Sequence, residues 1–103
     1  MGLFDFLTGS SKSGEKLSEA IKNGAFLVDV RSSGEFRTGS VKGAVNIPLD
    51  TIPSQLNKFK GKENIVVFCR SGMRSGQAKS ILERNGFTNV LNGGTVNKVS
   101  SLM

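Results

Sequence analysis

Short runs of β-branched and aromatic residues recur along this chain, and glycine, proline or asparagine bounds most of them. Apolar runs of roughly four to eight residues with such boundaries are typical of buried β-strands. The run Ile65-Val66-Val67-Phe68 is the strongest of them, because all of its residues favour strands. This pattern predicts strands at residues 26–30, 44–47, 65–68 and 89–91.

Apolar residues at helical spacing separate these runs. Leu17, Ala20 and Ile21 lie at i, i+3 and i+4, which predicts a helix at residues 15–23. Further on, the segment from Ser32 to Glu35 matches the S-x-x-E capping box that begins a helix. This helix is expected to run through Phe36 and Arg37 and to end at Gly39. Another is predicted at residues 50–59, capped by Asp50 or Thr51, with Pro53 in its first turn. The pattern also predicts a helix marked by Ala78, Ile81 and Leu82 and a short helix within residues 95–103.

Strands alternate with helices from residue 15 to the end of the chain. Parallel strands need crossover connections, which are usually helices, so this order predicts an α/β fold with a mostly parallel sheet and helices on both faces. The strands are near-continuous apolar runs, which agrees with burial on both faces. We expect a single domain at residues 15–103, preceded by a terminal segment and linker at residues 1–14.

The first seven residues are mostly apolar, with Leu3, Phe4 and Leu7 at helical spacing. We expect this segment to be a terminus that packs on the domain or is partly disordered, in preference to a membrane anchor. Residues 8–14 are typical of a Gly/Ser-containing linker. The run lacks a basic region and Asp5 interrupts it, so it is not a signal peptide. No stretch approaches the ~20 apolar residues of a membrane span. The sequence therefore predicts a cytoplasmic protein without a membrane partner.

Charged and reactive residues narrow the chemistry. The chain of 103 residues has 14 Lys+Arg and 8 Asp+Glu, so its net charge is 14 − 8 = +6, and it has one cysteine and no histidine. Without histidine there is no Ser-His-Asp triad and no Cys-His dyad, and one cysteine provides neither a zinc site nor an internal disulfide. We expect no metal and no cofactor. A lone thiol also suits a reducing compartment.

The excess of basic residues is spread along the chain. Only Lys58, Lys60 and Lys62 lie close together, beside Gly61, in a stretch typical of a solvated loop before a strand. No nucleic-acid-binding motif accompanies them. We therefore expect no nucleic-acid partner.

Cys69 ends the strongest strand, and a loop rich in arginine, glycine and serine follows it. Ligands of open α/β sheets bind at the carboxyl ends of the strands, where a strand–loop–helix turn directs backbone N–H groups and a helix N-terminus inward. Arg70 and Arg74 add two cations, and Gly72 permits the turn. Such groups lower a thiol pKa, so Cys69 is a candidate nucleophile that needs no histidine. The alternative is an inert, buried strand cysteine.

Several segments together resemble one family, the single-domain rhodaneses, which are sulfurtransferases. Motifs in the family's order and spacing are far more specific together than any one of them alone. The resemblance covers about residues 15–94 and rests on Leu27-Val28-Asp29-Val30-Arg31 with Glu35-Phe36 after it, on Gly39 through Pro48, on Cys69 through Ser75, and on Phe87 through Gly94.

The resemblance implies that the Cys69 thiolate takes sulfur from an anionic donor, thiosulfate or a persulfide, and becomes a persulfide itself. An acceptor then removes that sulfur, and cyanide, a small thiol and a protein thiol all remain open. This reading implies a thiosulfate sulfurtransferase of sulfur metabolism. The substrate-binding residues that it implies are Arg70, Ser71, Gly72, Met73, Arg74 and Ser75, and both arginines are expected to bind the donor and the leaving group. The resemblance also implies that Asp29 and Arg31 support the site through an ion pair or strand-end hydrogen bonds.

The resemblance also implies the rhodanese-like three-layer sandwich, with a central, mostly parallel five-stranded sheet. The opening strand has no obvious counterpart, although the segment from Leu3 to Leu7 is a candidate for it. Two other positions depart from the family pattern. Ser40 stands where the family often has histidine, and Thr95-Val96 replaces the usual aromatic residue after the double glycine.

Two other functions fit parts of the same sequence. Phosphatases and arsenate reductases of this fold use Cys-x5-Arg, commonly with histidine before the cysteine, whereas Cys69 to Arg74 is Cys-x4-Arg and Phe68 precedes it. The resemblance therefore favours sulfur over phosphate as the bound group. Non-catalytic rhodanese-like binding modules typically lose the cysteine, which this chain retains.

Overall fold

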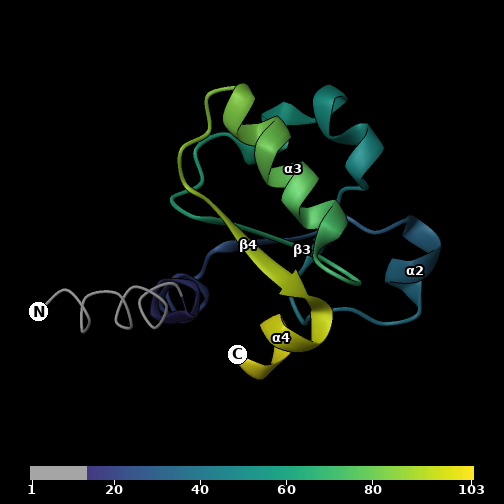
Figure 1. Cartoon of the computed structure of the whole chain (residues 1–103), viewed down its shortest axis with the longest axis vertical. Coiled ribbons are helices and arrows are strands. Elements are labelled where there is room, and N and C mark those ends of the chain that lie inside the picture. The colour runs from purple at the N-terminus through teal and green to yellow at the C-terminus, as the bar shows by residue number, and fades with distance from the viewer. Residues whose placement is uncertain (1–13) are drawn as a thin grey trace, which may run out of the picture.

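The structure is a computed structural model that describes residues 14–103. A helix at residues 14–22 comes first. The elements that follow are β1 (Phe26–Asp29), α2 (Ser33–Arg37), β2 (Val45–Asn46), the 3₁₀ helices η1 (Leu49–Ser54) and η2 (Leu56–Phe59), β3 (Ile65–Cys69), α3 (Met73–Arg84), β4 (Val90–Thr95) and α4 (Val96–Ser101). The predicted alternation of strands and helices is confirmed. Figure 1 shows α3 on one face of the sheet and α4 on the other.

The described residues form one sheet with the strand order β2-β1-β3-β4, and every pairing in it is parallel. The central strand β3 is buried along its whole length, as its apolar sequence predicts. The expected fifth strand is absent from residues 14–103, because the helix at 14–22 leads directly into β1 and leaves no chain for another strand. The segment from Leu3 to Leu7, the candidate for that strand, lies outside the described residues.

Two apolar cores make the sheet the middle layer of a three-layer sandwich. Side chains along a strand point alternately to opposite faces. Val67 and Cys69 accordingly lie in the core that α3 covers, whereas Val66 and Phe68 lie in the core shared with α4 and the helix at residues 14–22. The alternation directs Cys69 toward α3, which places its sulfur beside the first turn of that helix.

The helix predicted at residues 50–59 is instead two short 3₁₀ helices, η1 and η2. Gln55 separates them with φ −127°, outside the helical region. Pro53 lies inside η1 and has no N–H to donate, which disfavours a continuous α-helix there. The prediction that Asp50 or Thr51 caps this segment is wrong, because η1 begins without a side-chain cap.

The last strand extends beyond its predicted end. The sequence predicts a strand at residues 89–91 that the glycine pair closes, but β4 continues through Gly93 and Gly94 to Thr95. A register shift between Val67 and Phe68 of β3 accommodates this continuation. The glycine at position 93 permits close packing, because a Cβ there would lie 2.7 Å from Val99 Cγ2 and 2.9 Å from Val66 Cγ1.

The variant Gly93→Ala is expected to lower the free energy of unfolding by about 1–3 kcal/mol, because the added methyl group overpacks α4 against β3. The matched control is Gly34→Ala in α2, where a Cβ meets no atom within 4 Å. We expect Gly34→Ala to leave the free energy of unfolding unchanged or to raise it by up to about 1 kcal/mol, because alanine favours a helix over glycine. Urea unfolding measures both variants, and equal stability of Gly93→Ala and the wild type would contradict this account of β4.

Candidate functional site

The connection between β3 and α3 is a tight turn that ends at a glycine. Gly72 precedes the first residue of α3 and has φ +93°, in the left-handed region that disfavours side chains. A Cβ at Gly72 would also lie 3.7 Å from the Cα of Gly94. The left-handed turn at Gly72 is what brings the start of α3 back over the end of β3. The predicted strand–loop–helix arrangement is therefore present.

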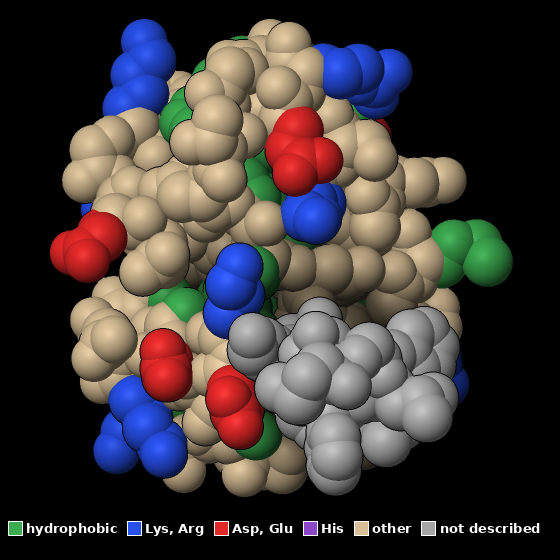
Figure 2. Space-filling view, turned by 60° about the vertical axis from the view of Figure 1, so that its left-hand side comes forward, with side chains coloured by type: hydrophobic (Ala, Val, Ile, Leu, Met, Phe, Trp, Pro, Cys, Tyr) green, Lys and Arg blue, Asp and Glu red, His purple; other side chains and the backbone are tan. Residues whose placement is uncertain are grey.

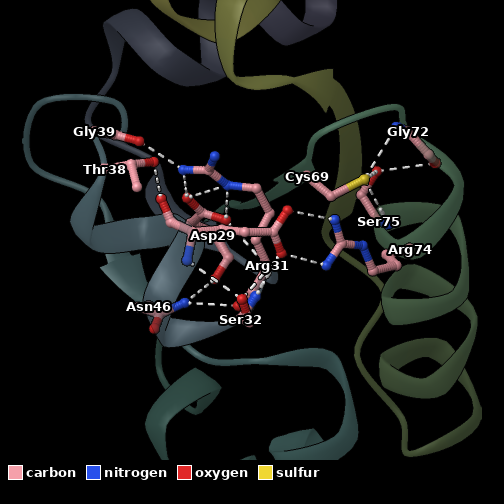
Figure 3. Close-up of polar contacts among 11 residues, drawn as sticks. Asp29, Arg31, Ser32, Thr38, Gly39, Asn46, Cys69, Gly72, Arg74 and Ser75 are labelled. Atoms are coloured by element: carbon pink, nitrogen blue, oxygen red, sulfur yellow. Dashed lines mark hydrogen bonds and ion pairs between the residues drawn. The ribbon is translucent and has the colours of Figure 1, made fainter.

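The sulfur of Cys69 lies inside this turn and accepts hydrogen bonds from the backbone. The Gly72 N–H donates to Sγ at 3.0 Å and the Ser75 N–H donates to it at 3.4 Å. The hydroxyl oxygen of Ser75 lies 3.6 Å from the same sulfur. Figure 3 shows the Cys69 sulfur facing Gly72 and Ser75. Cys69 has no exposed surface, so these groups replace the water that would otherwise solvate its thiolate.

The local hydrogen bonds outweigh burial in their effect on the thiol. Burial is the largest single influence and raises the pKa of Cys69, whereas the Ser75 side chain and the backbone N–H groups of Ser75, Gly72 and Ser71 lower it. Together, burial and these hydrogen bonds leave the pKa of Cys69 below the ordinary value of a cysteine. Donors that favour the charged form lower an acid's pKa in this way. The site therefore favours a thiolate without histidine.

Ser75 is itself held from the far side by β4. Its Oγ lies 2.7 Å from Asn92 Oδ1 and 3.0 Å from the Gly72 carbonyl oxygen. Asn92 Oδ1 also accepts a hydrogen bond from the Gly94 N–H at 2.9 Å. The sequence reading missed Asn92, and its position directly before the glycine pair is the only signal that points to it. Asn92 orients the hydroxyl that lies against the Cys69 sulfur.

Arg74 forms an ion pair that the sequence reading did not anticipate. Its Nη1 donates to Glu35 Oε1 at 2.8 Å and its Nη2 donates to Glu35 Oε2 at 3.0 Å. We expected both loop arginines to be available to an anionic donor, but Glu35 occupies both terminal nitrogens of Arg74. The capping-box pattern identifies Glu35 as a helix cap, and no sequence spacing places it beside a residue 39 positions away.

Asp29 and Arg31 form an ion pair, which is one of the two kinds of contact that the resemblance implies for them. Arg31 Nη2 and Asp29 Oδ2 lie 2.7 Å apart, and Arg31 Nε donates to both carboxylate oxygens at 3.0 Å. Arg31 Nη2 also donates to the Gly39 carbonyl, and Ser40 Oγ donates to Asp29 Oδ2 at 2.7 Å. The hydrogen bond to Asp29 raises the Arg31 pKa although burial lowers it. This network supports the carboxyl end of β1, beside β3.

The remaining loop side chains face outward. Arg70, Ser71 and Met73 are exposed, Met73 to 74%. Arg70 has no ion-pair partner among residues 14–103, so it is the loop arginine with an uncompensated charge. Arg70 also lines an open groove of about 450 Å³ whose other lining residues are Arg31, Gly39, Ser40, Thr95, Val96, Asn97 and Ser100. Basic and acidic side chains are interspersed on the face that Figure 2 shows.

The described part of the chain holds no group of three metal-binding side chains. Within residues 14–103, no helix is both long enough and apolar enough to cross a bilayer.

Comparison with known proteins agrees with this fold and loop. Residues 13–97 match the family model described as Rhodanese-like domain. The chain therefore belongs to the rhodanese-like domain family, as the resemblance of its motifs predicts.

Two of the similar proteins are named sulfurtransferases. A sulfurtransferase of Allochromatium vinosum is 34% identical over 80 residues, which cover 76% of this chain and 75% of that protein. The thiosulfate sulfurtransferase PspE of Escherichia coli is 35% identical over 75 residues, with 71% and 72% coverage. Another relative, YqhL of Bacillus subtilis, is 37% identical, but the match spans only 54% of its length. These names support sulfurtransferase chemistry as the general class.

A solved structure, a rhodanese with anions from E. coli, superimposes on this chain with a TM-score of 0.65 and 35% identity. The match covers 71% of this chain and 88% of that one. The α/β sandwich with its parallel sheet is therefore the rhodanese fold.

The variant Ser75→Ala is expected to raise the pKa of Cys69, because it removes the side-chain hydrogen bond and leaves the backbone donors in place. At a pH near the wild-type pKa, the variant would hold less thiolate and react more slowly with iodoacetamide. The pH dependence of the alkylation rate measures this shift. The control Ser80→Ala changes an exposed serine of the same helix, and an unchanged midpoint in Ser75→Ala would contradict a role for its hydroxyl.

Proposed function

We propose that this protein is a sulfurtransferase in which Cys69 carries sulfur from an anionic donor to a thiophilic acceptor. The observation that carries the proposal is the Cys69 sulfur enclosed by N–H donors between β3 and α3. Thiosulfate and persulfides are the proposed donors, and cyanide, a small thiol or a protein thiol is the proposed acceptor. The E. coli relative is named for thiosulfate, which supports that donor here.

The proposed first step is a displacement at sulfur. The Cys69 thiolate attacks the outer sulfur of thiosulfate, a new S–S bond forms, and the S–S bond of thiosulfate breaks. Sulfite leaves with the electron pair, so a thiolate and a dianion become a persulfide anion and a dianion. An acceptor thiolate or cyanide then takes the outer sulfur and returns Cys69 to its thiolate. No proton transfer is required, which fits a site without histidine.

The residues of the loop have distinct proposed roles. The N–H groups that stabilise the Cys69 thiolate are equally suited to the persulfide anion that replaces it. Arg70, which has no carboxylate partner in the described part of the chain, offers its guanidinium to an approaching anion. Ser71 and Met73 lie at the exposed rim of the loop. The ion pair of Asp29 with Arg31 is proposed to support the loop from β1, without touching the donor.

The competing functions have less support. The Cys-x4-Arg loop is shorter by one residue than the phosphatase and arsenate reductase loop, and a binding module has no use for a lowered cysteine pKa. We also propose the cytoplasm as the compartment, because a lone persulfide-forming thiol suits a reducing environment.

Intact-protein mass measurement after incubation with thiosulfate tests the proposal directly. Wild-type protein is expected to gain about 32 Da, the mass of one sulfur atom, and to lose it when cyanide is added. Cys69→Ser is the control, since it removes the only thiol in the chain while keeping its size. The absence of any gain with thiosulfate, methanethiosulfonate and glutathione persulfide would overturn the proposed function.

The variant Arg70→Ala is expected to raise the thiosulfate concentration needed for half-maximal persulfide formation by about tenfold, as for the loss of one charge-assisted hydrogen bond. Arg84→Ala is the matched control, because it removes the same charge from the last turn of α3, at the far end from the loop. Equal values for the two variants would mean that Arg70 contributes only to the general positive charge of the surface.

A further inference from the structure

The ion pair of Arg74 with Glu35 joins the reactive loop to α2. Both terminal nitrogens of Arg74 donate to the two carboxylate oxygens, so the contact is bidentate. In Figure 3, the dashed lines of this pair run from Arg74 toward the cluster around Arg31. The two side chains are 36% and 30% exposed, so the pair lies at the surface of the site, within reach of a ligand in solution.

Glu35 is held in place by its own helix. Its Oε1 accepts hydrogen bonds from the N–H and the hydroxyl of Ser32, both at 3.1 Å. Ser32 in turn accepts a hydrogen bond from the Glu35 N–H, which completes the capping box of α2. The hydrogen bonds from Arg74 and from the Ser32 backbone lower the pKa of Glu35 to about 2. The Glu35 carboxylate is therefore charged at neutral pH.

Arg74 is close enough to Cys69 to matter for its ligands. It precedes Ser75, whose N–H donates to the Cys69 sulfur. Its pKa is raised first by the hydrogen bond to Glu35 and also by the charge of Cys69. The charge of Arg74 therefore acts at the sulfur, but Glu35 already binds the edge of the guanidinium formed by Nη1 and Nη2. Among residues 14–103, an incoming anion meets one guanidinium without a carboxylate partner, at Arg70, and one that Glu35 already binds.

We infer that Glu35 is a positioning residue that sets donor selectivity, because its carboxylate compensates the charge of Arg74 and occupies one edge of its guanidinium. The inference rests on the proposed sulfurtransferase function. A dianion such as thiosulfate therefore meets an Arg74 whose positive charge Glu35 already compensates. A monoanionic donor gains less from a second arginine and therefore loses less when that arginine is occupied. Glu35 thus narrows the preference of the site for dianions over monoanions.

The variant Glu35→Gln separates this role from a structural one. Glutamine serves at the same position of a capping box, so α2 keeps its cap while the negative charge is removed. An exposed ion pair contributes only about 0–1 kcal/mol to stability, so the variant is expected to stay folded. Glu83→Gln is the matched control. It removes the same charge from an exposed ion pair with Lys79 on α3.

The experiment compares two donors that differ in charge and share a sulfonyl group. Thiosulfate is a dianion, and methanethiosulfonate is a monoanion that gives the same Cys69 persulfide and leaves as a sulfinate. In single-turnover persulfide formation, Glu35→Gln is expected to lower the half-saturating thiosulfate concentration by about threefold to tenfold. The corresponding value for methanethiosulfonate is expected to change by less than about twofold, as is the maximal rate with either donor. Glu83→Gln is expected to change neither.

A double-mutant cycle with Arg74→Gln tests whether the effect passes through Arg74. Glu35→Gln is expected to have no effect on thiosulfate use in a chain that already carries Arg74→Gln. The inference is overturned if Glu35→Gln leaves thiosulfate use unchanged, weakens it, or improves both donors equally, while the wild type still forms its persulfide. If the wild type forms no persulfide with any donor, the proposed function fails and the inference fails with it.

Discussion

The site depends on backbone N–H groups that point at a single sulfur atom. Gly72 adopts a left-handed conformation, and this turn brings its own N–H and that of Ser75 onto the Cys69 sulfur. Main-chain donors at the start of a helix are held by the secondary structure and need no rotamer to be fixed. A chain without histidine can therefore hold a thiol pKa below its ordinary value in a buried position, where burial alone would raise it.

The electrostatic field at the Cys69 sulfur depends more on which arginines are ion-paired than on how many arginines lie nearby. Three arginines lie near the ends of β1 and β3, but Asp29 binds one of them and Glu35 binds another. Arg70 is left as the cation without a carboxylate partner in the described residues. The overall charge of +6 therefore says little about the field at Cys69, which depends on which carboxylate each guanidinium reaches.

The incorrect predictions from sequence concern the backbone geometry of two segments. The segment at residues 50–59 has helical spacing, yet Pro53 and the break at Gln55 make it two 3₁₀ helices whose apolar residues are still buried. The glycine pair after residue 91 is typical of a strand end, but β4 needs Gly93 so that α4 can pack closely on β3. In both cases the apolar positions are predicted correctly and the backbone geometry is not.

The sequence by itself determined the parallel α/β architecture and the strand–loop–helix turn that follows the strongest strand, and it indicated a contact between Asp29 and Arg31. These features arise from residues close together in the chain, where periodicity, capping and turn preferences act directly. Only the tertiary structure decided that Glu35 binds Arg74 and that Asn92 orients Ser75. Those partners lie 39 and 17 residues apart, and the packing of α2 and β4 around the loop brings them together. Sequence spacing carries no information about such contacts, because the path of the chain between the partners sets the distance.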